Sequence, residues 1–177
     1  MALHHPERVR DLVFISTIAP TVGEPISLPP KPMIQVVFGS DFLMWMITTH
    51  FQSVMRPAMG VPEGYVLSDE EGEAVSDVIR SVLPIQLRTD GFVFDMFTSN
   101  RDMDRHPDQY TLENIAVPTL VIHAVDDSLA SYDNARALAE RIPGARLLSI
   151  ATGGHLLLGD NELIRSEPAK FLRLESR

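Results

Sequence analysis

The sequence predicts an α/β protein with three mainly parallel strands, flanking helices and an inserted helical segment. Two short runs near the C-terminus predict strands: VPTLVIH (117–123) has the pattern of a buried strand, and ARLLSI (145–150) is typical of another strand. A helical stripe lies between them and ends at Pro143-Gly144; it consists of Ala135, Leu138, Ala139 and Ile142. The order strand, loop, helix, strand, loop, helix indicates parallel strands joined by right-handed crossovers.

Two further segments complete the predicted core. The run VRDLVFIS (9–16) ends in a nearly continuous apolar stretch, which predicts a strand that is buried on both faces. Residues 162 to about 174 have a helical pattern that Pro168 interrupts. Because proline is best tolerated in the first turn of a helix, we expect a second short helix to begin at Pro168.

The middle of the chain, residues 33 to about 100, predicts an all-helical insertion. An extended connection, residues 19–32, precedes it, because no regular element survives so many prolines: Pro20, Pro25, Pro29, Pro30 and Pro32. Ser68 and Glu71 have capping-box spacing and predict the start of a helix. Three sets of apolar residues recur at helical spacing: Phe42, Trp45 and Met46; Ala74, Val75, Val78, Ile79 and Val82; Phe92, Met96 and Phe97.

The composition excludes several classes of protein. A net charge of −9 leaves no basic stripe for nucleic acid, and the absence of cysteine excludes disulfides, cysteine–zinc sites and a cysteine nucleophile. The most apolar window, residues 33–51, is too short and too polar to span a membrane. Residues 1–13 lack the apolar core of a signal peptide, so we expect a cytoplasmic protein.

Two polar residues follow neighbouring strands of the predicted sheet. Asp127 comes after the strand at 117–123, and His155 comes after the strand at 145–150. Because the loops after parallel strands lie at the same edge of a sheet, we expect the two side chains to come within hydrogen-bond distance. A buried aspartate that holds one ring nitrogen of a histidine fixes its tautomer and supports the imidazolium formed in catalysis.

Each of these residues also has a purely structural interpretation. A histidine after a strand usually serves packing, and paired aspartates in a turn usually stabilise the turn itself. His123 is expected near the same edge, where support of Asp127 is one possible role. The acidic run at 69–73 is typical of a solvated first helical turn rather than of a metal site. No histidine has metal-ligand spacing, and we expect neither a metal nor another cofactor.

The apolar residues of the insertion allow two interpretations. They either pack the insertion onto the sheet or line a pocket for an acyl or hydrocarbon group. Packing is the more common role of an apolar stripe, although methionine suits both roles because its side chain is flexible. The residues concerned are Phe42, Met44, Trp45, Met46, Met55 and Met59.

Four phrases together resemble the C-terminal half of an α/β-hydrolase. They are HPERVRDLVFIS (5–16), VPTLVIHAVDD (117–127), NARALAERIPGARLLSI (134–150) and GGHLLLG (153–159). The resemblance implies a partial α/β-hydrolase fold in three parts: a core strand segment at 1–19, a helical cap or lid at 20–110, and C-terminal core strands and helices at 111–177. It also implies a catalytic triad in which Asp127 is the acid, with Asp126 as the alternative, and His155 is the histidine.

The nucleophile that the resemblance implies is absent from these residues. α/β-Hydrolases carry it in G-x-S-x-G, or with aspartate in place of serine, and none of the ten glycines opens either motif. We therefore expect the nucleophile elbow upstream of Met1, so that the chain is truncated and inactive by itself. Ser16 and Ser131 are internal alternatives, but neither lies at a predicted strand–turn–helix elbow.

The resemblance implies an esterase-like hydrolase that cleaves small apolar esters through an acyl-enzyme in the complete enzyme. The alternative is an inactive remnant that acts as a binding module or as one subunit of a split hydrolase. Without a preceding half, the strand at 9–16 has an unpaired apolar edge. We expect this edge to cause self-association or to bind an N-terminal partner chain.

Overall fold

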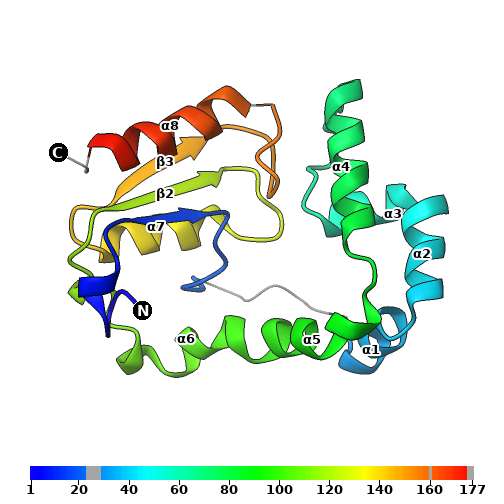
Figure 1. Cartoon of the computed structure of the whole chain (residues 1–177), viewed down its shortest axis with the longest axis horizontal. Helices are drawn as coiled ribbons and strands as arrows, with labels where there is room; N and C mark the ends of the chain where they lie inside the picture. Colours follow the sequence, from blue (N-terminus) through cyan, green and yellow to red (C-terminus); the bar gives the residue numbers. More distant parts are fainter. Residues whose placement is uncertain (23–28, 160, 175–177) are drawn as a thin grey trace.

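The computed structural model describes residues 1–22, 29–159 and 161–174 (Figure 1). The strands are β1 (Leu12–Ile15), β2 (Thr119–Ala124) and β3 (Arg146–Ile150). The helices are α1 (Lys31–Phe38), α2 (Asp41–His50), α3 (Gln52–Ala58), α4 (Asp69–Ser81), α5 (Thr89–Phe97), α6 (Asp102–Arg105), α7 (Tyr132–Arg141) and α8 (Asn161–Leu174). Short 3-10 turns occur at Pro6–Arg8, Gln86–Arg88, Ser99–Arg101, Pro107–Gln109 and Leu112–Asn114. None of the helices in these ranges is both long enough and apolar enough to cross a membrane.

The three strands form one parallel sheet in the order β1-β2-β3, which confirms the predicted fold class. Leu12 pairs with Thr119 and Leu120 pairs with Arg146, so that both loops after β2 and β3 leave the sheet at its carboxyl edge. All six residues of β2 are buried. Burial of this kind is typical of a central parallel strand with a helix on each face, although Thr119 and His123 are polar.

Helices α7 and α8 cover opposite faces of the sheet (Figure 1). Val121 of β2 packs in one cluster with Leu138 of α7, whereas Ile122 packs in another with Phe171 of α8. This alternation follows the pleat, which points successive side chains of a strand to opposite faces. Burial of each such side chain stabilises the fold by about 1.5–3 kcal/mol, so the two clusters fix the strand ends that carry the polar loops.

The first strand is shorter and more exposed than the sequence predicts. The expected strand at Val9–Ser16, buried on both faces, is in the structure the four-residue β1, and Ile15 at its end is 50% exposed. β1 is an edge strand of the described sheet, with β2 as its neighbour on one side. Helix α7 packs on β2 and β3, so an apolar pattern alone does not bury β1.

The segment between β1 and β2 is helical over most of its described residues. At its centre, the Ser68 hydroxyl accepts the N–H of Glu71 and the Glu71 carboxylate accepts the N–H of Ser68, which confirms the predicted capping box of α4. Phe38 of α1 stacks on Phe92 of α5 with ring centroids 4.3 Å apart. Helices α3 and α4 lie beyond the carboxyl ends of the strands (Figure 1). The division at residues 20–110 and the role as a cap stay predictions.

Two predictions about prolines need correction. Pro32 lies in the first turn of α1 rather than in the extended connection, since a proline there loses no helical hydrogen bond. Pro168 lies inside a continuous α8 rather than at the start of a second helix. Ile164 and Phe171, on either side of Pro168, both pack against the sheet. This packing stabilises the continuous helix although Pro168 has no N–H to donate to the helical hydrogen bonds. Pro25 lies outside the described residues.

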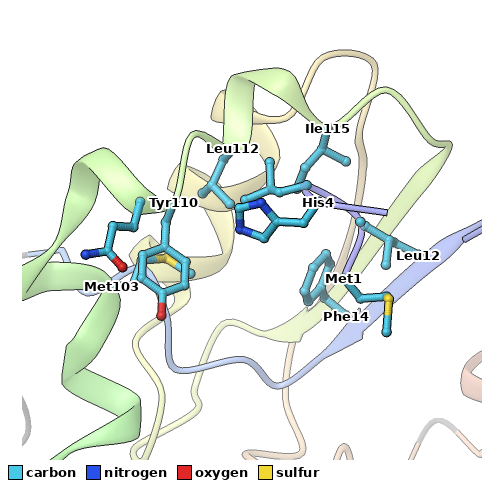
Figure 2. A pocket seen from close by; sticks show the side chains of 11 residues that line it. Met1, His4, Leu12, Phe14, Met103, Tyr110, Leu112 and Ile115 are labelled. Atoms are coloured by element: carbon cyan, nitrogen blue, oxygen red, sulfur yellow. The ribbon is translucent and has the colours of Figure 1, made fainter. Parts of the chain in front are cut away.

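A hollow of about 450 Å³ lies beside β1 (Figure 2). Its lining comes from the first residues of the chain, from β1 and from the segment before β2, and includes Met1, His4, Leu12, Phe14, Met103, Tyr110, Leu112 and Ile115. Leu12 and Phe14 also pack against the cluster under α7. The hollow therefore adjoins the core at the edge where β1 ends the sheet.

Candidate active site

The loops that follow β2 and β3 bring Asp127 and His155 together. Ala124 and Ile150 are partners in register at the ends of the two strands, so both loops begin at the same edge. The ring nitrogen Nδ1 of His155 lies 2.9 Å from the carboxylate Oδ2 of Asp127. The structure thus places the two predicted residues within hydrogen-bond distance, as parallel topology requires of loops that leave neighbouring strands.

The carboxylate of Asp127 is fully buried and surrounded by hydrogen-bond donors. Its Oδ1 accepts the backbone N–H groups of Leu129 at 2.8 Å and Ala130 at 2.9 Å. Its Oδ2 faces His155 at 2.9 Å and the Nε2 of His123 at 3.3 Å. Such partners are necessary, because an unpaired buried charge is strongly destabilising.

Two opposing effects act on the pKa of Asp127. Burial raises the pKa because it disfavours the charged form, but hydrogen bonds from His123, from His155 and from two backbone N–H groups outweigh burial. The result is a pKa well below the ordinary range of aspartate. Asp127 is therefore ionised at neutral pH, and its negative charge favours the tautomer of His155 that carries a proton on Nδ1.

The neighbouring Asp126 has a different set of contacts. Its Oδ1 accepts the N–H of Gly154 at 2.9 Å, and its Oδ2 accepts the N–H of Gly153 at 3.2 Å. Both glycines have positive φ, and a Cβ on Gly153 would lie 2.3 Å from the backbone oxygen of Leu158. Asp126 therefore holds the glycine loop in shape, whereas Asp127 contacts the imidazole. The geometry thus separates the two aspartates that the sequence leaves as alternatives.

Gly60 is a site residue that sequence reasoning missed. Its carbonyl oxygen accepts the backbone N–H of His155 at 3.0 Å, and a Cβ on Gly60 would lie only 2.3 Å from the Cβ of His155. Gly60 follows α3, so the helical insertion contacts the histidine loop directly. The available signal in the sequence is a glycine shortly after a helix, which predicts a helix end and no distant partner.

The second ring nitrogen of His155 faces outward. The His155 side chain is 27% exposed, and Nε2 has no hydrogen-bond partner among the residues that the structure describes. With Nδ1 held by Asp127, Nε2 is the nitrogen that can accept a proton from another group. The pair therefore has the arrangement of a general base with its orienting acid.

The two serines considered as internal nucleophiles are both engaged in hydrogen bonds with the backbone. The Ser16 hydroxyl donates to the backbone oxygen of His155 at 2.8 Å, not to the imidazole. The Ser131 hydroxyl accepts the N–H of Asp133 at the start of α7, where it is a helix N-cap. Both hydroxyls thus have structural contacts in the fold.

The apolar residues of the insertion have different environments. Met44 is fully buried, and Met55 and Met59 pack against a cluster that joins α4 to the loop after His155. Phe42 is 71% exposed and Trp45 is 47% exposed. Packing therefore accounts for Met44, Met55 and Met59 and not for the two aromatic residues. In the described part of the chain, no three histidine, aspartate or glutamate side chains are grouped so that they could hold a metal ion.

Comparisons with known proteins agree with this architecture. Residues 97–176 match an α/β-hydrolase family model described as TAP-like protein. No curated protein matches the chain. Among solved structures, 97% of the chain aligns with 59% of an enol-lactonase from Burkholderia xenovorans LB400, at 20% identity and a TM-score of 0.64. A hydrolase from Pseudomonas aeruginosa PA01 aligns over 97% of this chain and 58% of its own, at 22% identity and a TM-score of 0.62.

A third structure, an α/β-hydrolase enzyme from a Medee basin deep-sea metagenome library, aligns over 99% of this chain and 59% of its own, at 19% identity and a TM-score of 0.62. At these identities the likeness concerns the fold. The chain spans about 59% of the length of these solved structures. The molecule is an α/β protein with a partial parallel sheet whose polar loops meet at the carboxyl edge. The resemblance to the α/β-hydrolase superfamily is confirmed, and the chain has part of the α/β-hydrolase fold.

Proposed function

We propose that this chain supplies the acid and the histidine of an esterase-like α/β-hydrolase that cleaves small apolar esters. In this proposal Asp127 orients His155, and His155 transfers a proton from the nucleophile hydroxyl to the leaving alcohol. The observation that supports it most directly is the 2.9 Å contact between His155 Nδ1 and Asp127 Oδ2, while Nε2, at the carboxyl edge of the sheet, has no hydrogen-bond partner in the described part of the chain. An imidazole held in this way is suited to act first as general base and then as general acid.

The proposed reaction passes through an acyl-enzyme. Nε2 of His155 accepts the hydroxyl proton of a nucleophile while the nucleophile oxygen attacks the ester carbonyl carbon. The imidazolium then donates that proton to the leaving alcohol, and the acyl group stays on the nucleophile. Water attacks the acyl group while Nε2 accepts a proton from it, and the proton returns to the nucleophile as the carboxylic acid leaves. Asp127 stays ionised and stabilises the imidazolium in both steps.

We propose that the nucleophile belongs to polypeptide outside these 177 residues, either an upstream segment or a separate N-terminal chain. In the described sheet, β1 has a neighbour on one side only, and the hollow next to it is lined in part by Leu12 and Phe14. A strand followed by a helix would pair with this edge and fill the hollow. Self-association through the same edge is the competing outcome.

A second candidate function is a binding module without catalytic activity. The observation that favours it is the exposure of Phe42 and Trp45, whose ring centroids lie 6.0 Å apart on α2. Exposed aromatic side chains that lie together are typical of contact surfaces for other molecules. In this alternative Asp127 and His155 only stabilise the loops at the sheet edge.

The test is hydrolysis of p-nitrophenyl acetate and butyrate, measured once with the protein purified from the cells that naturally produce it (the cellular form) and once with the 177-residue chain alone. We expect turnover by the cellular form, a loss of about 10³-fold or more in His155→Ala, and a large loss in Asp127→Asn. His106→Ala, at an exposed histidine on the surface, is the matched control and should keep full activity. Equal rates for wild type and His155→Ala would reject the proposal, and no turnover in any form would favour the binding module.

The proposed location is the cytoplasm. The chain has no cysteine and so makes no use of the disulfides that an oxidising compartment permits. Fractionation of cells followed by immunodetection tests this part of the proposal. Recovery of the protein from an extracellular or periplasmic fraction would reject it.

A further inference from the structure

His123 is a polar residue in the most buried strand of the molecule. Its side chain is completely inaccessible to solvent, although β2 on either side of it is apolar. Its Nδ1 is buried without a hydrogen-bond partner among the described residues. Half of the hydrogen-bonding capacity of the ring is therefore unused, which disfavours a histidine here relative to an apolar side chain of similar size. Packing alone does not account for this residue, so its other nitrogen must supply the compensating contacts.

That nitrogen, Nε2, lies 2.8 Å from the backbone oxygen of Ala130 and 3.3 Å from Oδ2 of Asp127. A backbone carbonyl only accepts hydrogen bonds, so Nε2 must carry a proton. Burial lowers the pKa of His123, but its contacts with Asp127 and Ala130 outweigh burial and leave this pKa raised. The Nε2 proton is present in both the neutral and the charged ring, so the donor persists whichever form is populated.

The contacts of His123 form a closed ring with the acid loop. The backbone carbonyl of Ala130 accepts a hydrogen bond from His123, and the backbone N–H of the same residue donates to Oδ1 of Asp127 at 2.9 Å. The other carboxylate oxygen faces both His123 and His155. Through its single Nε2–H group, His123 thus connects β2 to Asp127 at one end of the acid loop and to Ala130 at the other.

The remaining polar groups near His123 are occupied with each other. The Tyr132 ring lies 6.4 Å from the His123 ring between centroids, and Ser149 is the partner of His123 in the register of β3. The hydroxyls of Tyr132 and Ser149 are hydrogen-bonded to one another at 2.6 Å. Neither supplies a partner for Nδ1, which agrees with a residue retained for its Nε2 proton.

We propose that His123 is a positioning residue for Asp127: its Nε2–H holds the Ala130 carbonyl and the shared carboxylate oxygen so that Oδ2 faces Nδ1 of His155. The consequence for catalysis rests on the function proposed above. The positioning itself is a property of the folded chain and needs neither nucleophile nor substrate. Its readout is the tautomer of neutral His155, because the proton stays on Nδ1 only while the carboxylate faces that nitrogen.

The test uses two amides at one buried position. In His123→Gln the side-chain amide nitrogen occupies the position of Nε2 of the wild-type ring, and in His123→Asn it occupies the position of Nδ1. Both variants bury one amide group, so they differ mainly in where the N–H donor lies. We measure the tautomer of His155 by ¹⁵N NMR of the imidazole, and the hydrogen exchange of the Leu129 and Ala130 amides. In His123→Asn we expect the ratio of the Nε2–H tautomer to the Nδ1–H tautomer of His155 to rise about fivefold or more, which is the effect of losing one hydrogen bond. We also expect faster hydrogen exchange of the Leu129 and Ala130 amides. His123→Gln should stay close to wild type.

An unchanged tautomer ratio and unchanged amide exchange in a folded His123→Asn protein would overturn the proposal, as would equal effects of the two variants. If His123→Asn does not fold, His123→Leu replaces it, because leucine buries no unpaired amide and still lacks the donor. The same shift of tautomer is expected for His123→Leu. Because no substrate enters these measurements, a protein without esterase activity can still pass this test, and an active esterase can still fail it.

Discussion

The backbone carbonyl of Gly60 accepts the N–H of His155, and no side chain fits between the two residues. Gly60 follows α3 in the helical insertion, whereas His155 follows β3 in the core. The approach is possible because Gly60 has no Cβ and a φ of +76°, a conformation that other residues rarely adopt. The loop that presents the imidazole is therefore shaped from two sides, by Asp126 within the core and by Gly60 from the insertion.

Gly60→Ala should displace His155 and destabilise the fold. The new Cβ would lie 2.3 Å from the Cβ of His155, too close for the backbone to stay in place. Gly64→Ala is the matched control, because Gly64 has nearly the same φ and a Cβ there would meet nothing within 4 Å. We expect Gly60→Ala to lower the free energy of unfolding by about 1–3 kcal/mol more than Gly64→Ala in urea titrations. Equal losses would show that the close approach does not occur.

The parts of the fold that could be predicted from the sequence are those with local signals. β2 and β3 are apolar runs between turn residues, and the capping box at Ser68 marks the start of α4. The contact of Asp127 with His155 follows from topology, since parallel neighbours place their loops at one edge. Residue spacing alone does not decide between the two aspartates, because a shift of one residue in the turn exchanges them; the family resemblance is what favours Asp127.

Other features depend on contacts that no local pattern encodes. Gly60 meets His155 through the tertiary packing of the insertion, and a glycine after a helix most often only ends that helix. The half-exposed state of β1 depends on its neighbours in the sheet rather than on its own apolar residues. The unbroken α8 depends on packing that outweighs the local effect of Pro168.

Asp127→Asn should destabilise the protein in a manner that depends on pH. The lowered pKa of Asp127 means that the folded state favours the ionised carboxylate, so this contribution is complete above the ordinary aspartate pKa of about 4 and is lost as pH falls towards the lowered value. At pH 7 we expect a loss of about 2–3 kcal/mol, because the amide cannot accept all the hydrogen bonds of the buried carboxylate. The measurement is urea unfolding from pH 7 to pH 3. A difference from wild type that stays constant over this range would contradict the assignment.

Asp126→Asn should loosen the glycine loop without removing the contact between Asp127 and His155. One of the two carboxylate acceptors for the N–H groups of Gly153 and Gly154 becomes a donor, so one hydrogen bond is lost. We expect a cost of about 1 kcal/mol and faster hydrogen exchange at these two amides. The tautomer of His155 should stay as in wild type. A shift of this tautomer in Asp126→Asn would mean that the two aspartates share one role.

The open edge of β1 should make the isolated chain associate. Its end residue Ile15 is half exposed, and an unpaired apolar edge is a template for pairing with another chain. We expect dimers or larger species in sedimentation velocity at micromolar concentration, and a shift towards monomer in Ile15→Lys. Leu87→Lys, at a highly exposed residue of the insertion, is the control and should not change the association. A wild-type chain that stays monomeric and unfolds cooperatively would reject this prediction.

Pro168→Ala should stabilise the protein. Pro168 lies in the interior of α8, where it has no N–H to donate to the carbonyl four residues earlier, at Ile164. Alanine restores that hydrogen bond and removes the clash of the ring, so we expect a gain of about 1–3 kcal/mol in the free energy of unfolding. Pro32→Ala is the matched control, because a proline in the first turn of α1 lacks only an N–H that has no partner in the helix. If both substitutions have the same small effect, then Pro168 occupies the start of a separate helix in solution, as the local pattern alone would suggest.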